Sequence, residues 1–280
     1  MLDAVLTAFA SLFVQIVFTA GIVGLCGMFI SFCNRCFCDG LEDTAFFVVR
    51  ITGFVGTPVH ELSHALMCLI FGHRITDMKI YSLKKRSKML GYVEHAYNKR
   101  NIYHLIGNFF IGIAPIVVGG LVVTVFVRLL TPWMYNDMVR EFNDVIGAEG
   151  AKIFTELIKS IVSVFGSVFR LNNFANWRWW ICIIFSFAIS IHMEISRSDI
   201  KGGLKGLGVI AILLAVADLI MAFLFPGALS VMTSAFVTAG IYIGMFLMIP
   251  AIFAAIALLL AGLTALIDAI SDSISNSRDE

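Results

Sequence analysis

Residues 4–33 read AVLTAFASLFVQIVFTAGIVGLCGMFISFC, a stretch without a charged side chain. It is longer than the roughly 20 apolar residues that a bilayer-spanning helix needs. The rest of the chain is similar: 59% of its 280 residues are hydrophobic and 14% are charged. Soluble domains are roughly 45–50% apolar and about 25% charged, so this chain has too few polar side chains to cover a water-exposed surface. The composition excludes soluble, disordered, fibrous and nucleic-acid-binding proteins and predicts an all-α polytopic membrane protein.

Hydropathy predicts about six transmembrane helices. The predicted spans are residues 4–32, 44–71, 104–130, 177–195, 204–225 and 228–267. The last is too long for one straight crossing, and Pro250 offers a place to kink or break it. Between the third and fourth spans, apolar residues recur at helical spacing over 151–170, which predicts an amphipathic helix lying in the membrane interface. No repeat or linker divides the chain, so residues 1–280 are expected to form a single integral-membrane domain.

The basic residues are distributed unevenly between the two sides of the predicted membrane. Twelve of the 20 Lys and Arg residues fall on the side that holds both termini, in the loop 73–103, in the connection 196–203 and at Lys205 and Arg278, against six at most on the opposite side. The positive-inside rule places that side in the cytoplasm, and the cell membrane is the expected location. The first span lacks a basic n-region and is too long for a signal-peptide core, so we expect it to remain as a spanning helix.

The motif that carries chemistry lies late in the second predicted span, where residues 56–67 read GTPVHELSHALM. Positions i and i+4 share one face of a helix, so His60 and His64 can bind one Zn²⁺ through their imidazole nitrogens. Glu61 lies beside the first ligand, where it can accept a proton from zinc-bound water and return it to a leaving amine. Ionisable groups inside a membrane are costly and indicate function; the alternative is that both histidines only make interhelical hydrogen bonds.

The motif and the residues after it resemble the site-2 protease family of intramembrane zinc metalloproteases. The resemblance covers about residues 53–125 and, more weakly, 190–208. It includes the motif helix, short strands around 78–83 and 91–95, and NFFIGIAP starting at Asn108. It implies a small β-hairpin after the motif helix and a metalloprotease domain with Zn²⁺ that hydrolyses peptide bonds in or near the transmembrane segments of membrane-protein substrates.

The resemblance also implies how a substrate is held. The hairpin is expected to add an extended substrate strand by edge pairing, because a helical substrate hides its peptide carbonyls in internal hydrogen bonds. Asn108 is the expected substrate-binding residue, since a side-chain amide can donate to an extended peptide or an oxyanion. The alternative for Asn108 is a hydrogen bond that bridges two helices.

A third zinc ligand is needed, because a catalytic zinc keeps three protein ligands and one open position. The candidates are Asp199, His192, Asp218 and Glu194. The family resemblance implies an Asp at the cytoplasmic end of a later span, and residues 198–203, SDIKGG, are similar to that site although the glycines come later. Asp199 is therefore the expected ligand, with His192 and Asp218 left open as alternatives. Such a donor set predicts about one zinc per chain.

Two other functions stay open on the sequence. A non-proteolytic membrane transporter or metal-binding scaffold would keep His60 and His64 as an ion site without needing Glu61. A membrane hydrolase acting on a prenylated or lipidated peptide would use similar zinc chemistry. Proteolysis that depends on Glu61 distinguishes the protease from the transporter or scaffold.

Other cysteines and histidines are expected to have ordinary structural roles. Cys33, Cys36 and Cys38 lie close in the sequence, but no second cluster completes a zinc site with them, which favours cysteines at a helix end. His95 and His104 flank a basic loop and are expected to be solvated or interfacial.

Overall fold

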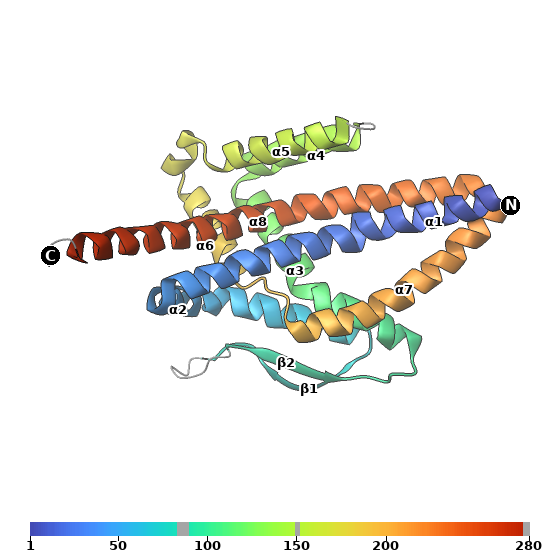
Figure 1. Cartoon of the computed structure of the whole chain (residues 1–280), viewed down its shortest axis with the longest axis horizontal. Coiled ribbons are helices and arrows are strands. Elements are labelled where there is room, and N and C mark those ends of the chain that lie inside the picture. The colour runs from blue at the N-terminus through green and yellow to red at the C-terminus, as the bar shows by residue number, and fades with distance from the viewer. Residues whose placement is uncertain (83–89, 149–151, 277–280) are drawn as a thin grey trace.

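A computed structural model describes residues 1–82, 90–148 and 152–276. These residues form a largely helical protein with a β-hairpin on one side (Figure 1). The elements are α1 (Leu2–Ile16), the π-helical turn η1 (Val17–Gly21), α2 (Ile22–Ile70), β1 (Arg74–Lys79), β2 (Tyr92–Ala96), α3 (Ile102–Leu130), α4 (Pro132–Ile146), α5 (Lys152–Val168), the 3-10 turn η2 (Leu171–Ala175), α6 (Trp177–Ser190), α7 (Arg197–Leu224) and α8 (Pro226–Asn276). The predicted all-α architecture with one small hairpin is confirmed.

Four helical stretches of the described chain are long and apolar enough to cross a membrane. They are Leu2–Gly40, Ile102–Leu130, Arg197–Leu224 and Pro226–Ile267. The predicted count of about six spans is not confirmed. The predicted span 177–195 forms only α6, whose 14 residues are fewer than the roughly 20 that a crossing needs. The predicted span 44–71 is helical but carries the polar motif residues, which reduce its hydropathy.

The first two predicted spans are not separated by a non-helical connection. Helix α2 continues from Ile22 to Ile70. Figure 1 shows the chain reversing direction within this helical stretch, so that its first and last parts lie side by side. Phe37 from the first part packs with Val48 and Val49 from the second. Helix α8 also continues through Pro250, so the predicted break there is absent.

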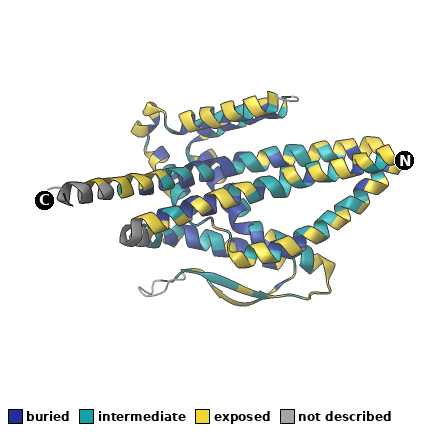
Figure 2. Cartoon of the chain, in the orientation of Figure 1, coloured by how far each residue is buried: buried dark blue, intermediate teal, exposed yellow. Residues whose placement is uncertain are grey.

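The core lies where α2, α3, α6 and α8 pack together. Ile30, Ile116, Trp179 and Leu247 are fully buried there. Figure 2 shows buried residues concentrated at the centre of the helices, while exposed residues line the outer helices. Large apolar side chains such as Phe13 are exposed on this exterior, and an extensive apolar exterior is suited to lipid rather than water.

The hairpin that follows the motif helix is present but begins earlier than predicted. Strands β1 and β2 pair antiparallel, with Arg74 opposite Ala96 and Lys79 opposite Tyr92. The first strand begins at Arg74 rather than at residue 78, because α2 ends at a left-handed glycine. Gly72 has φ 69°, a conformation that a Cβ would strain, and the chain extends directly after it.

The predicted amphipathic helix is confirmed as α5, which packs on α4. Its polar side faces the protein: Ser160 Oγ donates to the Glu141 carbonyl at 3.0 Å and Ser163 Oγ to the Glu141 carboxylate at 2.8 Å. Phe154 and Val162 on the apolar side are exposed. An apolar side directed away from the protein is the arrangement expected for a helix in contact with lipid.

Candidate metal centre

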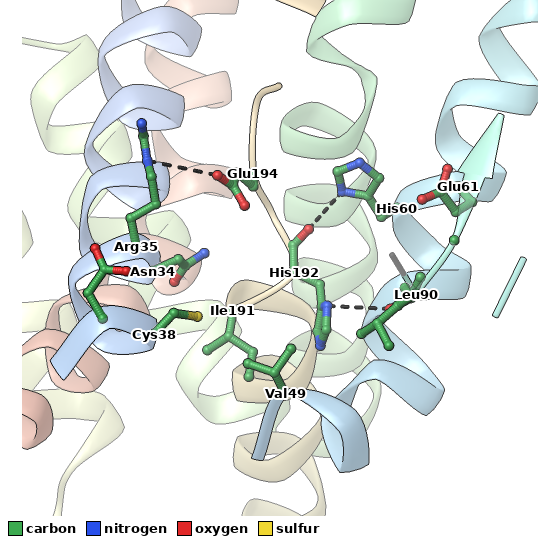
Figure 3. Close-up of a pocket in the computed structure, with 13 residues that line it drawn as sticks. Asn34, Arg35, Cys38, Val49, His60, Glu61, Leu90, Ile191, His192 and Glu194 are labelled. Atoms are coloured by element: carbon green, nitrogen blue, oxygen red, sulfur yellow. Dashed lines mark hydrogen bonds and ion pairs between the residues drawn. The ribbon is translucent and has the colours of Figure 1, made fainter. Parts of the chain in front are cut away.

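The two motif histidines are oriented by backbone carbonyls from other parts of the chain. His60 Nδ1 lies 2.7 Å from the carbonyl oxygen of His192, and His64 Nδ1 lies 2.9 Å from that of Ile111 in α3 (Figure 3 for His60). A carbonyl only accepts, so Nδ1 carries the hydrogen in both rings and each Nε2 keeps a free lone pair. The ring centroids are 5.0 Å apart. Metal-binding histidines are typically oriented in this way by a hydrogen bond from the other ring nitrogen.

Asp199, in the first turn of α7, is the carboxylate that the structure brings to this pair. Its Oδ2 lies 3.9 Å from His64 Nε2. A capping box holds it in place: the Ser196 amide donates to Asp199 Oδ2 at 3.0 Å, and the Asp199 amide donates to Ser196 Oγ at 3.1 Å. Residues 196–203 were predicted as a connection between spans, which is wrong, because this cap starts α7 at Arg197.

The donor set fits zinc. Two imidazole nitrogens and one carboxylate oxygen are the ligands of many catalytic zinc sites, which leave a fourth position open. The three donor atoms of His60, His64 and Asp199 do not all lie within 4.8 Å of one another in the described chain. Side-chain movement would therefore be needed to close them on one ion.

The alternative ligand His192 contributes its backbone rather than its ring. Its Nε2 lies 3.2 Å from Thr52 Oγ1 and its Nδ1 lies 3.4 Å from Thr57 Oγ1. Both ring nitrogens thus face threonine hydroxyls of α2, while the carbonyl accepts the hydrogen bond from His60. The geometry makes His192 an orienting residue of the site.

The other two acidic candidates have different partners. Glu194 lies 3.8 Å from Arg35 Nε, as Figure 3 shows. Asp218 is fully buried and accepts a hydrogen bond from Gln15 Nε2 of α1 at 3.1 Å. Within the described residues, neither carboxylate has a hydrogen bond or ion pair with a motif histidine.

Glu61 lines a polar cavity of about 340 Å³ together with His60 and Gly91. The other lining residues are Asn34, Arg35, Cys38, Asp39, Val49, Thr57, Leu90, Ile191, His192 and Glu194 (Figure 3). The hairpin backbone contacts the Glu61 side chain closely, because a Cβ on Gly91 would lie 2.7 Å from Glu61 Cγ. The site thus has a carboxylate, an imidazole and polar surroundings facing one space.

Asn108 lies on the face of α3 that packs against the start of α7. It is 5% exposed, and its amide nitrogen has no hydrogen-bond partner in the described chain. One helical turn later on the same face, a Cβ on Gly112 would lie 2.7 Å from the Asp199 carbonyl oxygen. A buried donor without a partner costs about 1–3 kcal/mol, so this amide is available to a polar ligand near Asp199.

Several residues at the site were missed by sequence reasoning. The carbonyls of His192 and Ile111 carry no signal in the sequence, since every residue has one. Thr57 is detectable, because it lies four positions before Glu61 and so shares its helix face. The expectation that His95 is solvated or interfacial did not include its partner: the half-buried His95 has its Nδ1 3.0 Å from Nδ1 of His73. Burial lowers the pKa of both His73 and His95, which favours their neutral forms.

The chain has no match among protein-family models, curated proteins or solved structures. The resemblance to site-2 proteases therefore rests on the residues named above. The structure places the Asp199 carboxylate beside His64 of the motif helix, and a cavity beside His60 and Glu61 of the same helix.

Proposed function

We propose that this chain is an intramembrane zinc metalloprotease that hydrolyses peptide bonds in or near the transmembrane segments of membrane proteins. The observation that carries the proposal is the approach of Asp199 to the motif: His64 Nε2 lies 3.9 Å from Asp199 Oδ2, and both motif imidazoles donate Nδ1–H to backbone carbonyls. The apolar helices support a multi-pass location in the cell membrane, and the uneven distribution of Lys and Arg supports cytoplasmic termini.

The metal would be held by His60 and His64 through Nε2 and by Asp199 through a carboxylate oxygen. When bound, Zn²⁺ makes water nucleophilic near neutral pH and polarises the scissile carbonyl. The carbonyls of His192 and Ile111 orient the two rings through Nδ1, which leaves both Nε2 lone pairs available to a metal. The Ser196 cap does the same for the carboxylate.

Glu61 is assigned to proton transfer. It accepts the proton of the attacking water and delivers it to the nitrogen of the leaving peptide. The side chain is 7% exposed and lines the same cavity as His60, so it faces a space that water and a peptide can share. The close approach of Gly91 restricts its position, because a Cβ there would lie 2.7 Å from Glu61 Cγ.

The hairpin and α3 are assigned to substrate binding. A transmembrane segment must unwind before cleavage, because a helix hides its carbonyls in internal hydrogen bonds. Strand β2 begins directly after Gly91, which lies against Glu61, so a substrate strand paired with the edge of β2 would pass close to this carboxylate. The free amide of Asn108 is a donor for the extended peptide.

The test is proteolysis by the full chain reconstituted with a panel of single-span membrane proteins and prenylated peptides. We expect the wild type to cleave a single-span protein, and Glu61→Gln to lose cleavage by at least about a hundredfold while keeping its zinc. Glu156→Gln is the matched control, because Glu156 pairs only with Lys159 on the outside of α5 among the described residues. Undiminished cleavage by Glu61→Gln would refute the proposal. Zinc without any cleavage would favour a transporter or scaffold, and cleavage of prenylated peptides alone would favour the lipidated-peptide hydrolase.

A further inference from the structure

A second cluster of metal-ligand side chains lies where α2 ends and the hairpin begins. One donor atom each from Cys68, His73 and His95 all lie within 4.8 Å of one another, and this is the one such group within the described residues. Cys68 and His73 are buried and His95 is half-buried. None of the three belongs to the His60, His64 and Asp199 set. We propose that this cluster is a second Zn²⁺ site, separate from the catalytic centre.

The end of α2 folds His73 back onto Cys68. The His73 amide donates to the Cys68 carbonyl at 2.8 Å, and the Gly72 amide donates to the Leu69 carbonyl at 3.3 Å. With Gly72 at φ 69°, these two bonds form a Schellman cap. In such caps the residue after the glycine meets the residue that accepts its hydrogen bond, and the contact is commonly apolar. Here it brings together an imidazole and a thiol.

The third donor comes from the hairpin. His95 lies on β2 opposite Ile75 of β1, and its Nδ1 is 3.0 Å from His73 Nδ1. His73 Nε2 donates to the carbonyl of His104 at 2.9 Å, so His73 Nδ1 has its lone pair directed at the cluster. Two nitrogens that each lie about 2.1 Å from a tetrahedral zinc are about 3.4 Å apart. A small opening of the histidine pair therefore accommodates the ion.

The chemistry of the donors favours zinc. A thiolate with two imidazoles is a zinc-type donor set, with water in the fourth position. The Cys68 thiol is fully buried and is not in a disulfide. The hydrogen bond from His73 to the His104 carbonyl is again the kind that orients a metal-binding ring.

This site would tie the hairpin to the motif helix. Cys68 lies one helical turn beyond His64, about 6 Å along the axis, so the two sites are neighbours without a shared ligand. An ion here would link the end of α2 to β2, and β2 starts beside the Gly91 contact with Glu61. Its role is to fix the position of the hairpin at the cavity.

The site is tested by metal analysis and cobalt substitution of the purified full chain in detergent. We expect two zinc ions per wild-type chain, one in Cys68→Ser, one in His95→Gln, and one in His64→Gln. The cobalt-loaded wild type should show a thiolate-to-cobalt charge-transfer band in the near ultraviolet, because the motif site has no sulfur ligand. Cys68→Ser should lose this band and His64→Gln should keep it. Cys182→Ser is the matched control, since this other buried thiol has hydroxyl neighbours that satisfy a serine.

A wild-type protein that binds a single zinc and shows no thiolate band overturns the inference. In that case His73 and His95 only share a hydrogen bond. Retention of the band in Cys68→Ser also overturns it. If Cys68→Ser does not fold, as judged by gel filtration, His95→Gln on the half-buried strand carries the same test. Failure of the protease proposal is distinguishable, because cleavage would be absent while the thiolate band persists.

Discussion

Gly91→Ala tests whether the hairpin positions Glu61, the proposed proton-transfer residue. A Cβ at this position would lie 2.7 Å from Glu61 Cγ, 2.8 Å from Thr57 Cγ2 and 2.9 Å from the Ile80 carbonyl oxygen. Thr57 and Glu61 share one face of α2, and the Ile80 carbonyl belongs to the backbone directly after β1. The methyl group therefore forces the hairpin and the motif helix apart.

The size of the effect follows from these distances. Carbon atoms in ordinary contact are about 3.5–4.0 Å apart, so the contact with Glu61 must lengthen by about 0.8–1.3 Å. Misplacing a catalytic group by about 1 Å costs about a hundredfold in rate, and overpacking costs about 1–3 kcal/mol of stability. Zinc content should not change, because Glu61 is not assigned as a ligand. We expect kcat to fall by about a hundredfold in a folded, zinc-loaded protein.

The assay is steady-state cleavage of a single-span substrate in detergent, with zinc content and gel filtration measured on the same samples. Gly208→Ala is the matched control, because a Cβ on this exposed residue of α7 meets no atom within 4 Å. Its rate should equal that of the wild type. A folded Gly91→Ala protein that cleaves at the wild-type rate would refute the positioning role of the hairpin.

Four further substitutions examine the proposed third ligand and its support. Asp199→Ala should lose one zinc equivalent by metal analysis, because only two imidazoles remain at the motif site; His192→Ala should retain that zinc, because its backbone carbonyl remains. Zinc kept by the first variant and lost by the second would reassign the ligand. Asp218→Asn should leave zinc content unchanged, since Asp218 pairs with α1 inside the bundle; loss of zinc would place it at the site. Gly112→Ala should weaken zinc binding and lower the free energy of unfolding, measured with denaturant, by about 1–3 kcal/mol. The reason is that its Cβ would lie 2.7 Å from the Asp199 carbonyl oxygen. An unchanged zinc affinity would contradict this prediction.

Features set by local sequence were predictable. The apolar stretch that became α3 was predicted over 104–130 and is observed at Ile102–Leu130. The hairpin was predicted from short strands, and Gly72 explains why β1 begins before the predicted residue. His60 and His64 share a helix face because both lie within α2, as their spacing indicated.

Features set by tertiary packing were not predictable. Hydropathy averages over a window, so it did not show that the first two predicted spans are joined by helical residues, and it assigned a crossing to the short helix α6. The start of α7 was missed although its signal is in the sequence. Ser196 and Asp199 are three positions apart, which is the spacing of a capping box. Reading that signal would have placed Asp199 on a helix.

The candidate site depends on three glycines as well as on its polar side chains, because each glycine lets two segments approach closely. A Cβ on Gly56 would overlap the Ala188 carbonyl and the His192 ring, so Gly56 allows the segment that orients His60 to approach α2. Gly91 likewise allows the hairpin to approach α2, and Gly112 allows the start of α7 to approach α3. The motif supplies two imidazoles and a carboxylate on α2. The His192 segment and the hairpin each reach α2 across a glycine contact, and Asp199, the proposed third ligand, reaches α3 across another. A methyl group added at Gly56 or Gly91 would push the His192 segment or the hairpin away from the motif helix, and one at Gly112 would push Asp199 away from α3. Each change would leave every proposed ligand in the sequence. The motif alone therefore does not specify the site.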